Sequence, residues 1–325
     1  MLAEKLITAY NTKPKPNVLV IGDLMLDHYV FGSANRLSPE APVPIININK
    51  ETKIVGGAAN VASNLKDLGA NVSLAGIVGN DLAGEEIKNI LKVNQIDTSL
   101  IINDNNRITT VKTRIIAGNH HIVRVDKEDT HSISELLENS FLDKLNANFS
   151  NADIVVLSDY NKGLLSHNLT LKIIEKCNQL NIRVIVDPKG LDYSKYLGAY
   201  IIKPNRKELA EAAKKEKLTN SNDLVEAANY IFKITQANYL VVTLSEAGIA
   251  VISNSDSKII PVVATEVYDV TGAGDTVIAT LSYCLTMGFS VEEAATVANY
   301  AAAIVIKHIG SATTSIPEIV QSINQ

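Results

Sequence analysis

The run Asp269–Asp275, which reads Asp-Val-Thr-Gly-Ala-Gly-Asp, is the part of the sequence best suited to chemistry. It stands where a strand pattern gives way to a helix pattern. Gly272, Ala273 and Gly274 leave their backbone N–H groups uncovered, and together with the positive end of the helix dipole these groups can bind an anion. A carboxylate directly after such a turn is suited to accept a proton from a hydroxyl group that attacks a bound phosphate. The alternative is a glycine-rich helix start in which Asp275 is only a first-turn carboxylate.

The composition is that of an ordinary globular protein. The chain has 325 residues, of which 46% are hydrophobic and 20% charged, enough for one large α/β domain or two smaller ones. A net charge of −5 and a pI near 5.7 argue against a general nucleic-acid or membrane-surface binder. Residues 1–15 lack a basic-then-apolar leader pattern, and no apolar run approaches the length of a membrane span. Cys177 and Cys284 lie in helix patterns and are expected to be buried, reduced thiols, so we expect a cytoplasmic protein.

Strand and helix patterns alternate along most of the chain. Strands are predicted at 18–23, 72–78, 154–157, 184–186, 200–202 and 239–244, and helices at 58–68, 83–93, 169–180, from 205 and at 223–236. Two antiparallel edge strands (248–252 and 258–263), a short extended run (265–268) and two closing helices (275–287 and 291–307) complete the pattern. This order predicts an α/β fold with a mostly parallel central sheet and helices on both faces, in a single domain spanning 1–325.

Two strand-rich excursions interrupt the alternation, at about 28–50 and 108–126. The first contains three prolines, and the second reads as a hairpin that turns at Gly118-Asn119. They predict a small sheet that stands off the main domain as a lid over a pocket. An exposed sheet face tends to associate with another protein surface. A homodimer formed through the lid sheets is therefore expected.

Polar residues follow one predicted strand after another, at the edge where an open parallel sheet binds its ligands. They occur at Asp23 and Asp27, Ser158–Gly163, Asp187–Gly190, Lys203–Glu208, Thr243–Ser245 and the glycine turn before Asp275. Any one of these could be a solvated loop, but their repetition at the same edge predicts a binding site there.

Two glycine motifs carry a family resemblance. Gly56-Gly57-Ala58-Ala59-Asn60 and Asp269–Asp275 resemble the two motifs of the ribokinase-like (PfkB) carbohydrate kinases, and the similarity spans the chain. Three further segments narrow the resemblance to one group within this family, the D-glycero-β-D-manno-heptose 7-phosphate kinases. They are Arg36–Pro44, which reads Arg-Leu-Ser-Pro-Glu-Ala-Pro-Val-Pro, Ser158–Gly163 and Asp187–Gly190. The resemblance implies a ribokinase-like three-layer sandwich with a β-sheet lid. It also implies ATP- and Mg²⁺-dependent phosphorylation of the heptose phosphate at O1, giving the 1,7-bisphosphate for ADP-heptose and lipopolysaccharide synthesis.

The resemblance also assigns roles to individual residues. Asp275 would be the base, and the backbone N–H groups of the turn before it would stabilise the transferred phosphoryl group. Asn205 and Glu208 match an Asn-x-x-Glu element that reaches the phosphates and, through water, Mg²⁺. The two residues also fit a helix capping box, and both readings can hold together.

Further positions are candidates for the sugar, the nucleotide and ions. Asp27, Gly57 and Asn60 are expected to hold sugar hydroxyls. A phosphate on the sugar requires cations, for which the candidates are Arg36, Lys112, Arg114, Arg124, Lys162 and Lys189; the alternative is a charged, solvated edge strand. Nucleotide-lining candidates are Thr243, Ser245, Gly248 and Asn299. The family often binds a monovalent cation such as K⁺ beside the glycine turn, where Asp269 and Thr271 are suitably placed.

Other functions fit the sequence less well. Another sugar or sugar-phosphate kinase of the same superfamily would differ only in its substrate. A sugar-binding relative that has lost catalysis typically lacks the aspartate after the glycines, whereas Asp275 is present here. A dinucleotide-dependent oxidoreductase is disfavoured, because the first strand leads into Gly22-Asp23-Leu24-Met25 and not into G-x-G-x-x-G. Many heptose kinases continue into an adenylyltransferase with a His-x-Gly-His motif that is not found here, so this chain is either a stand-alone kinase or a fragment.

Overall fold

The computed structural model describes residues 1–118, 120–263, 267–308 and 310–325. The strands are β1 (Asn17–Gly22), β2 (Leu24–Leu37), β3 (Pro44–Gly57), β4 (Asn71–Gly79), β5 (Ile101–Asp104), β6 (Thr110–Ala117), β7 (His120–Lys127), β8 (Ile154–Ser158), β9 (Arg183–Asp187), β10 (Ile201–Ile202), β11 (Tyr239–Thr243), β12 (Ile249–Ser253) and β13 (Ser257–Ile260). The α-helices are α1 (Leu2–Thr12), α2 (Ala58–Asp67), α3 (Leu82–Val93), α4 (Glu135–Phe149), α5 (His167–Gln179), α6 (Arg206–Ala212), α7 (Ser221–Thr235), α8 (Ala273–Thr286), α9 (Val291–Val305) and α10 (Ile316–Ile323).

The large sheet has the strand order β13-β12-β11-β10-β9-β8-β1-β4-β5. The strands from β11 to β5 in this order run parallel, whereas β12 and β13 form an antiparallel edge. All side chains of the central strand β8 are buried, as expected for a parallel strand that is covered on both faces. The predicted mostly parallel sheet with an antiparallel edge is therefore confirmed.

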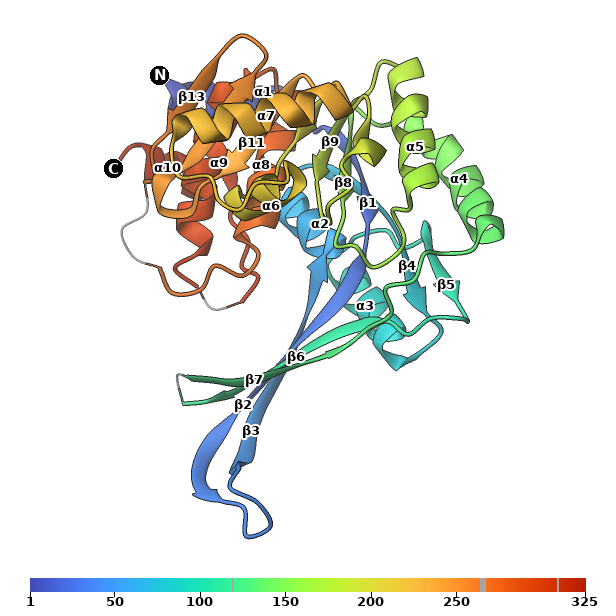
Figure 1. Ribbon diagram of the computed structural model, residues 1–325, viewed down its shortest axis with the longest axis vertical. Coiled ribbons are helices and arrows are strands. Elements are labelled where there is room, and N and C mark those ends of the chain that lie inside the picture. Colours follow the sequence, from blue (N-terminus) through green and yellow to red (C-terminus); the bar gives the residue numbers. More distant parts are fainter. Residues whose placement is uncertain (119, 264–266, 309) are drawn as a thin grey trace.

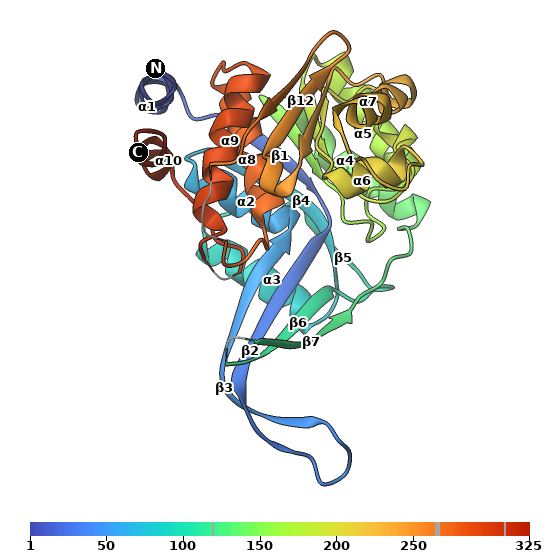
Figure 2. The same ribbon diagram turned by 60° about the vertical axis from the view of Figure 1, so that its left-hand side comes forward.

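Alternate side chains of each strand divide the core into two layers of packing. Val18 and Val20 of β1 pack with the helices α2, α8 and α9, while Leu19 and Ile21 pack on the other face with α4, α5 and α7. Figures 1 and 2 show the helices on both sides of the sheet. The result is the expected three-layer sandwich.

The lid sheet has the order β3-β2-β6-β7 and extends away from the body of the molecule (Figures 1 and 2). Its register places Asp27 opposite Lys112, and Lys112 opposite Asp126, so these three side chains share one face. The other face carries Val123 and Val125, whose side chains are exposed. One face of the lid sheet therefore carries the charges of Asp27, Lys112 and Asp126, and the other exposes two valines on the same side as the ion pair of His28 and Glu51.

One prediction about the C-terminal part is wrong, because a third helix, α10, follows the two that were expected to close the chain. Ser315 caps it, and its apolar face buries Ile316 and Ile319 beside α1. With eight residues it is too short for its periodicity to stand out in the sequence. The strand β5 and the helix α4 were not predicted either. Asn119 of the expected hairpin turn and residues 265–266 of the expected extended run lie outside the described residues.

None of the helices in the described ranges is long and apolar enough to cross a lipid bilayer.

Candidate functional site

The glycine turn before α8 is held in a backbone conformation that suits glycine. Gly272 has a φ of 79°, and a Cβ atom at this position would lie 2.9 Å from Nδ2 of Asn60. No side chain of the described residues caps the first turn of α8. The N-terminus of this helix therefore remains open to an anion from outside the chain.

Asp275, in the first turn of α8, is buried and accepts two hydrogen bonds. Nδ2 of Asn60 donates to Oδ2 at 2.7 Å, and the hydroxyl of Tyr160 donates to Oδ1 at 2.8 Å. Burial raises the pKa of Asp275 to about 6, although both hydrogen bonds and the charge of Lys203 act in the opposite direction. The carboxylate is thus fixed in position and ionised at neutral pH, as a general base must be.

Asp27 reaches the same region from β2. Gly56, on the neighbouring strand, allows this approach, because a Cβ atom there would lie 2.5 Å from Oδ2 of Asp27. Gly57 has a φ of 61° as α2 begins, and this helix carries Asn60. The charge of Asp27 contributes to the raised pKa of Asp275. The structure thus brings Asp27, Gly57, Asn60 and Asp275 together.

A buried acidic cluster supports the loop after β8. One oxygen of Asp23 accepts hydrogen bonds from the backbone N–H groups of Tyr160, at 2.8 Å, and Lys162, at 3.1 Å. Asp159 is paired with Lys195 at 2.5 Å. Burial and the charge of Asp159 raise the pKa of Asp23 to about 6, while its backbone hydrogen bonds lower it. These contacts fix the backbone from which Tyr160 reaches Asp275.

A second buried ion pair lies close to Asp275. Lys203, which follows β10, is 3% exposed, and its Nζ is 3.0 Å from Oδ1 of Asp187 at the end of β9. Burial raises the pKa of Asp187 to about 7; Lys203 opposes this rise, whereas the charges of Asp275 and Glu208 add to it.

Asn205 and Glu208 form the predicted capping box at the start of α6. Oδ1 of Asn205 accepts the Glu208 N–H at 2.8 Å, and Oε2 of Glu208 accepts the Asn205 N–H at 2.9 Å. The other oxygen of Glu208 accepts a hydrogen bond from Lys189 at 2.7 Å. Lys189, a candidate for the sugar phosphate, therefore lies beside Glu208.

The remaining nucleotide candidates lie around the ends of β11 and β12. Thr243 forms an isolated bridge with Asn205, and Ser245 and Gly248 flank the short turn that leads into β12. Asn299 of α9 is buried and donates a hydrogen bond to the carbonyl of Pro261 at 2.6 Å. That bond fixes the Asn299 side chain on the α9 face of the sheet.

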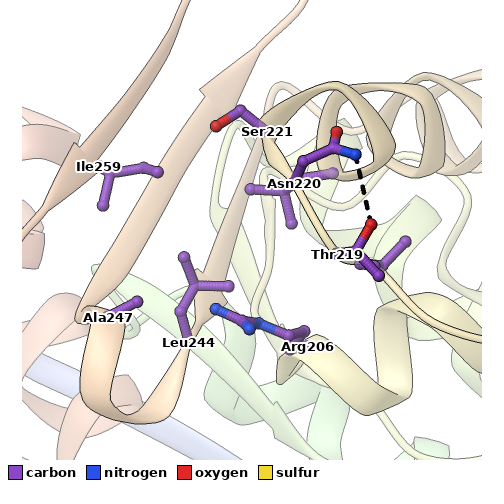
Figure 3. A pocket seen from close by; sticks show the side chains of 9 residues that line it. Arg206, Thr219, Asn220, Ser221, Leu244, Ala247 and Ile259 are labelled. Carbon is purple, nitrogen blue, oxygen red and sulfur yellow. Dashed lines mark hydrogen bonds between the residues drawn. The ribbon is translucent and has the colours of Figure 1, made fainter.

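A pocket of about 160 Å³ lies beside the turn that follows β11 (Figure 3). It is lined by Arg206, Leu218, Thr219, Asn220, Ser221, Leu224, Leu244, Ala247 and Ile259. Leu244 packs in the core layer of α6 and α7, opposite the layer of α9. The pocket thus lies on the other face of the sheet from Asn299 and has no carboxylate among its lining residues.

Within the described residues, the candidate phosphate-binding cations other than Arg36 are engaged with carboxylates. Glu128 bridges Lys162, at 2.7 Å, and Lys112, at 3.4 Å, and Lys112 also contacts Asp126. Arg124 pairs with the same Asp126, and Arg114 pairs with Asp27. The exposed Arg36 lies near the outer end of the β2–β3 ribbon, which points away from α8 (Figures 1 and 2). The structure does not bring Arg36 to Asp275 within one chain.

Asp269 and Thr271, the candidates for a monovalent cation, bond to each other. Oδ1 of Asp269 accepts from the N–H and the hydroxyl of Thr271, and Oδ2 accepts from the N–H of Gly310 at 2.9 Å. Burial acts to raise the pKa of Asp269, but these hydrogen bonds outweigh it and lower the pKa.

Sequence reasoning missed Tyr160 and Lys203 as site residues. Both stand in the polar runs that follow β8 and β10, so their position at the ligand-binding edge was a usable signal. A tyrosine or lysine after a strand is common, however, and only the packing shows that these two side chains turn inward to Asp275 and Asp187.

Known proteins resemble this chain in sequence. Residues 15–319 match the family described as pfkB family carbohydrate kinase. The chain is 46% identical over 304 residues to the bifunctional protein HldE of Sulfurimonas denitrificans, covering 94% of this chain and 63% of the relative. It is 48% identical over 308 residues to the bifunctional protein HldE of Helicobacter pylori strain HPAG1, covering 95% and 66%. The chain thus spans less than two thirds of the length of these curated relatives.

Solved structures resemble this fold at low sequence identity. Arabidopsis thaliana ribokinase complexed with ribose and ATP has a TM-score of 0.76 and 19% identity, covering 96% of this chain and all of the other. Escherichia coli phosphofructokinase-2 in complex with potassium has a TM-score of 0.78 and 19% identity, covering 95% and 98%. The fold is ribokinase-like, and with the family match and the 46–48% identical relatives it follows that the chain belongs to the pfkB family of carbohydrate kinases.

Proposed function

We propose that this sugar kinase transfers the γ-phosphoryl group of ATP to O1 of D-glycero-β-D-manno-heptose 7-phosphate, giving the 1,7-bisphosphate used in ADP-heptose and lipopolysaccharide synthesis. The observation that carries the proposal is a pair of lysines from two separate elements, Lys112 on the lid sheet and Lys162 on the β8 loop, joined by Glu128. Such a pair suits a sugar that already bears a phosphate. The Arg36–Pro44 motif and the identity to the HldE proteins support the heptose.

In the proposed mechanism, Asp275 accepts the proton of the anomeric hydroxyl as its oxygen attacks the γ-phosphorus atom. Asn60 and Tyr160 hold the carboxylate in position, and Asp27 accepts hydrogen bonds from sugar hydroxyls. The N–H groups at the start of α8 stabilise the negative charge on the phosphoryl oxygens. The chain acts here as one kinase unit, in which the lid sheet covers the sugar.

The residues fit a magnesium ion that is held largely by phosphates and water. Glu208 offers carboxylate oxygens, the ligands that Mg²⁺ prefers, and the described part of the chain contains no cluster of three or more potential metal ligands. When bound, Mg²⁺ would neutralise charge on the phosphates. We also propose that Asp269 accompanies a monovalent cation such as K⁺; its two oxygens accept three hydrogen bonds, which leaves room for a further contact.

The substrate is tested by ADP release from the purified protein with a panel of acceptors. The panel contains D-glycero-D-manno-heptose 7-phosphate, fructose 6-phosphate, fructose 1-phosphate, ribose and adenosine. Turnover confined to the heptose phosphate is expected. Preferred turnover of another sugar would disprove the heptose assignment and leave the kinase mechanism intact.

The first prediction concerns the hydrogen bond from Tyr160 to Asp275. Because Asp275 must be ionised to accept a proton, kcat/KM should fall as the pH drops through about 6, the pKa of Asp275. The Tyr160 hydroxyl stabilises the ionised form of Asp275, so Tyr160→Phe should raise this pKa. The pH at which kcat/KM falls on the acidic side of its pH profile should therefore rise by about one unit. The measurement is the pH profile of kcat/KM, with the surface variant Tyr10→Phe as the control. An unmoved limb in Tyr160→Phe would contradict the assignment.

A second prediction concerns Lys112 and Lys162. Each Lys→Met variant should raise KM for the phosphorylated sugar by about 10- to 100-fold, the scale of one lost charged hydrogen bond. KM for ATP should stay within a factor of about 2, because neither side chain is assigned to the nucleotide. Glu128 competes with the sugar phosphate for both ammonium groups. Glu128→Gln removes this competition and should not raise KM for the phosphorylated sugar. The control is Lys258→Met on the surface. Equal increases in KM for ATP and for the sugar would argue against a role of these lysines in binding the sugar phosphate.

A homodimer through the lid sheets is the proposed assembly. The face of the lid opposite to Asp27 and Lys112 carries Val123, 47% exposed, and Val125, 53% exposed. We expect the double variant V123D/V125D to elute as a monomer in size-exclusion chromatography with light scattering. The unmodified protein should have roughly twice the chain mass, since an exposed apolar sheet face favours a partner. An unmodified protein that is monomeric at micromolar concentration would exclude this assembly.

A further inference from the structure

Arg107 lies where the lid sheet joins the body of the molecule. It stands between β5 and β6, and its side chain is 6% exposed. Nη1 donates a hydrogen bond to the carbonyl of Lys162 at 2.7 Å, and Nη2 donates to the carbonyl of His131 at 2.8 Å. Its Nε lies 3.4 Å from Oδ2 of Asp104. The guanidinium group thus fastens the chain that enters the lid at β6 to both the β8 loop and the segment that follows β7.

The backbone of Lys162 is held by charged side chains of both signs. Its carbonyl accepts the hydrogen bond from Arg107, and its N–H donates to the buried Asp23 at 3.1 Å. The next residue, Gly163, has a φ of 91°, and a Cβ atom there would lie 1.9 Å from the carbonyl oxygen of His131. The β8 loop and the segment that follows β7 are therefore in direct backbone contact beside Arg107.

A buried guanidinium group is a costly way to hold a loop. Its carboxylate contact among the described residues is the long one to Asp104, and apolar side chains often stabilise a buried site as well as an ion pair does. An arginine adds a planar fork, whose donors keep fixed directions and can hold two carbonyl groups at a set separation. The carbonyl groups that Arg107 holds belong to the segments that carry Lys162 and Glu128. Lys112 follows Arg107 on the chain that enters β6.

We propose that Arg107 is a positioning residue of the sugar-phosphate site, which sets the spacing of Lys112 and Lys162 so that one phosphate group can contact both. The inference rests on the proposed function, in which these two lysines hold the phosphate of the sugar. In the structure Glu128 lies between the two ammonium groups, 3.4 Å from Lys112 and 2.7 Å from Lys162. A phosphate group carries more negative charge and more acceptor oxygens than a carboxylate, so it displaces Glu128 from the two lysines when the sugar binds.

Arg107→Lys keeps a positive charge beside Asp104 but loses the fork. KM for the best phosphorylated sugar of the panel should rise about tenfold, because a displaced ammonium group binds the phosphate less well. The value of kcat should stay within a factor of about 3, and the pH profile of kcat should not move, because the N–H of Tyr160 remains bonded to Asp23. The matched control is Arg183→Lys at the exposed start of β9, which should change none of these values.

A residue that only stabilises the β8 loop would behave differently. Loosening the whole loop would also release Tyr160, so kcat would fall and its pH profile would shift, and this result would overturn the proposal. A double-mutant cycle tests whether Arg107 acts through Lys162. Adding Arg107→Lys to Lys162→Met should raise KM for the phosphorylated sugar by a factor of about 3 or less. A full tenfold rise in that background would show independent effects and would also overturn the proposal.

Acetylation of lysines, followed by mass spectrometry, tests the shared phosphate without turnover. Each phosphorylated sugar of the panel is added in turn. A bound sugar phosphate should protect Lys112 and Lys162 in parallel, and in Arg107→Lys the same concentration should protect them less. The exposed Lys258 should be acetylated equally in all samples.

The outcomes separate the two proposals. Protection that Arg107→Lys leaves unchanged would overturn the role of Arg107 and leave the proposed function intact. Lack of protection by every phosphorylated sugar would overturn both. If Arg107→Lys does not fold, Asp104→Asn takes its place in each measurement, because it removes the carboxylate beside the guanidinium group and leaves the arginine present. The same directions are expected, and an unchanged KM together with unchanged protection would again overturn the proposal.

Discussion

Asp275→Asn is expected to lower kcat by about 10²–10⁴, the usual contribution of a positioned general base. The amide cannot accept the proton of the sugar hydroxyl. The fold should tolerate the change, because the new amide can keep its oxygen toward Asn60 and donate to the Tyr160 hydroxyl, which is able to accept. Nucleotide binding should therefore remain, and the loss should appear in kcat.

The measurement is steady-state turnover with the best sugar, together with calorimetric binding of a non-hydrolysable ATP analogue. Asp143→Asn, the same substitution on the exposed side of α4, is the matched control and should leave kcat unchanged. Full turnover by a folded Asp275→Asn variant would exclude Asp275 as the base. Loss of nucleotide binding together with turnover would instead indicate that the substitution disturbs the start of α8.

The second large effect is expected on stability, from Lys195→Met. Nζ of Lys195 contacts Oδ2 of Asp159 at 2.5 Å and the carbonyl of Leu165 at 3.0 Å, in the buried region behind the β8 loop. Removing one partner of a buried ion pair leaves the other charge uncompensated, which typically costs about 3–5 kcal/mol. Asp159 would then lack its cation beside Asp23, whose pKa burial and the charge of Asp159 already raise to about 6. The free energy of unfolding should fall accordingly.

Urea denaturation of the purified variants measures this change. Lys258→Met is the matched control, because it breaks an exposed pair with Glu292 that solvent screens, and it should change the stability little. The double variant Asp159→Asn/Lys195→Met should recover part of the lost stability, since no lone charge remains buried. A Lys195→Met protein as stable as Lys258→Met would show that the pair contributes little.

Most of the order of elements was readable from the sequence, and so was the edge of the sheet at which a site was expected, because both depend on local patterns. Apolar runs that end in polar residues predicted the parallel sheet and its ligand-binding edge, as β8 and β9 illustrate. The glycines before Asp275 predicted an open helix start, since a positive φ at Gly272 suits no other residue as well. The family resemblance supplied roles that these patterns left open.

Pairing between distant side chains was decided only by the tertiary structure. The sequence marked Lys112 and Arg114 as cations, but their engagement with Glu128 and Asp27 depends on the register of the lid strands and on the fold of the loops. The contact of Tyr160 with Asp275 joins residues 115 positions apart. Such contacts follow from packing, in which every residue between them takes part, and no local propensity encodes them. The pKa of Asp275 near 6 has the same origin, because burial is a property of the folded chain.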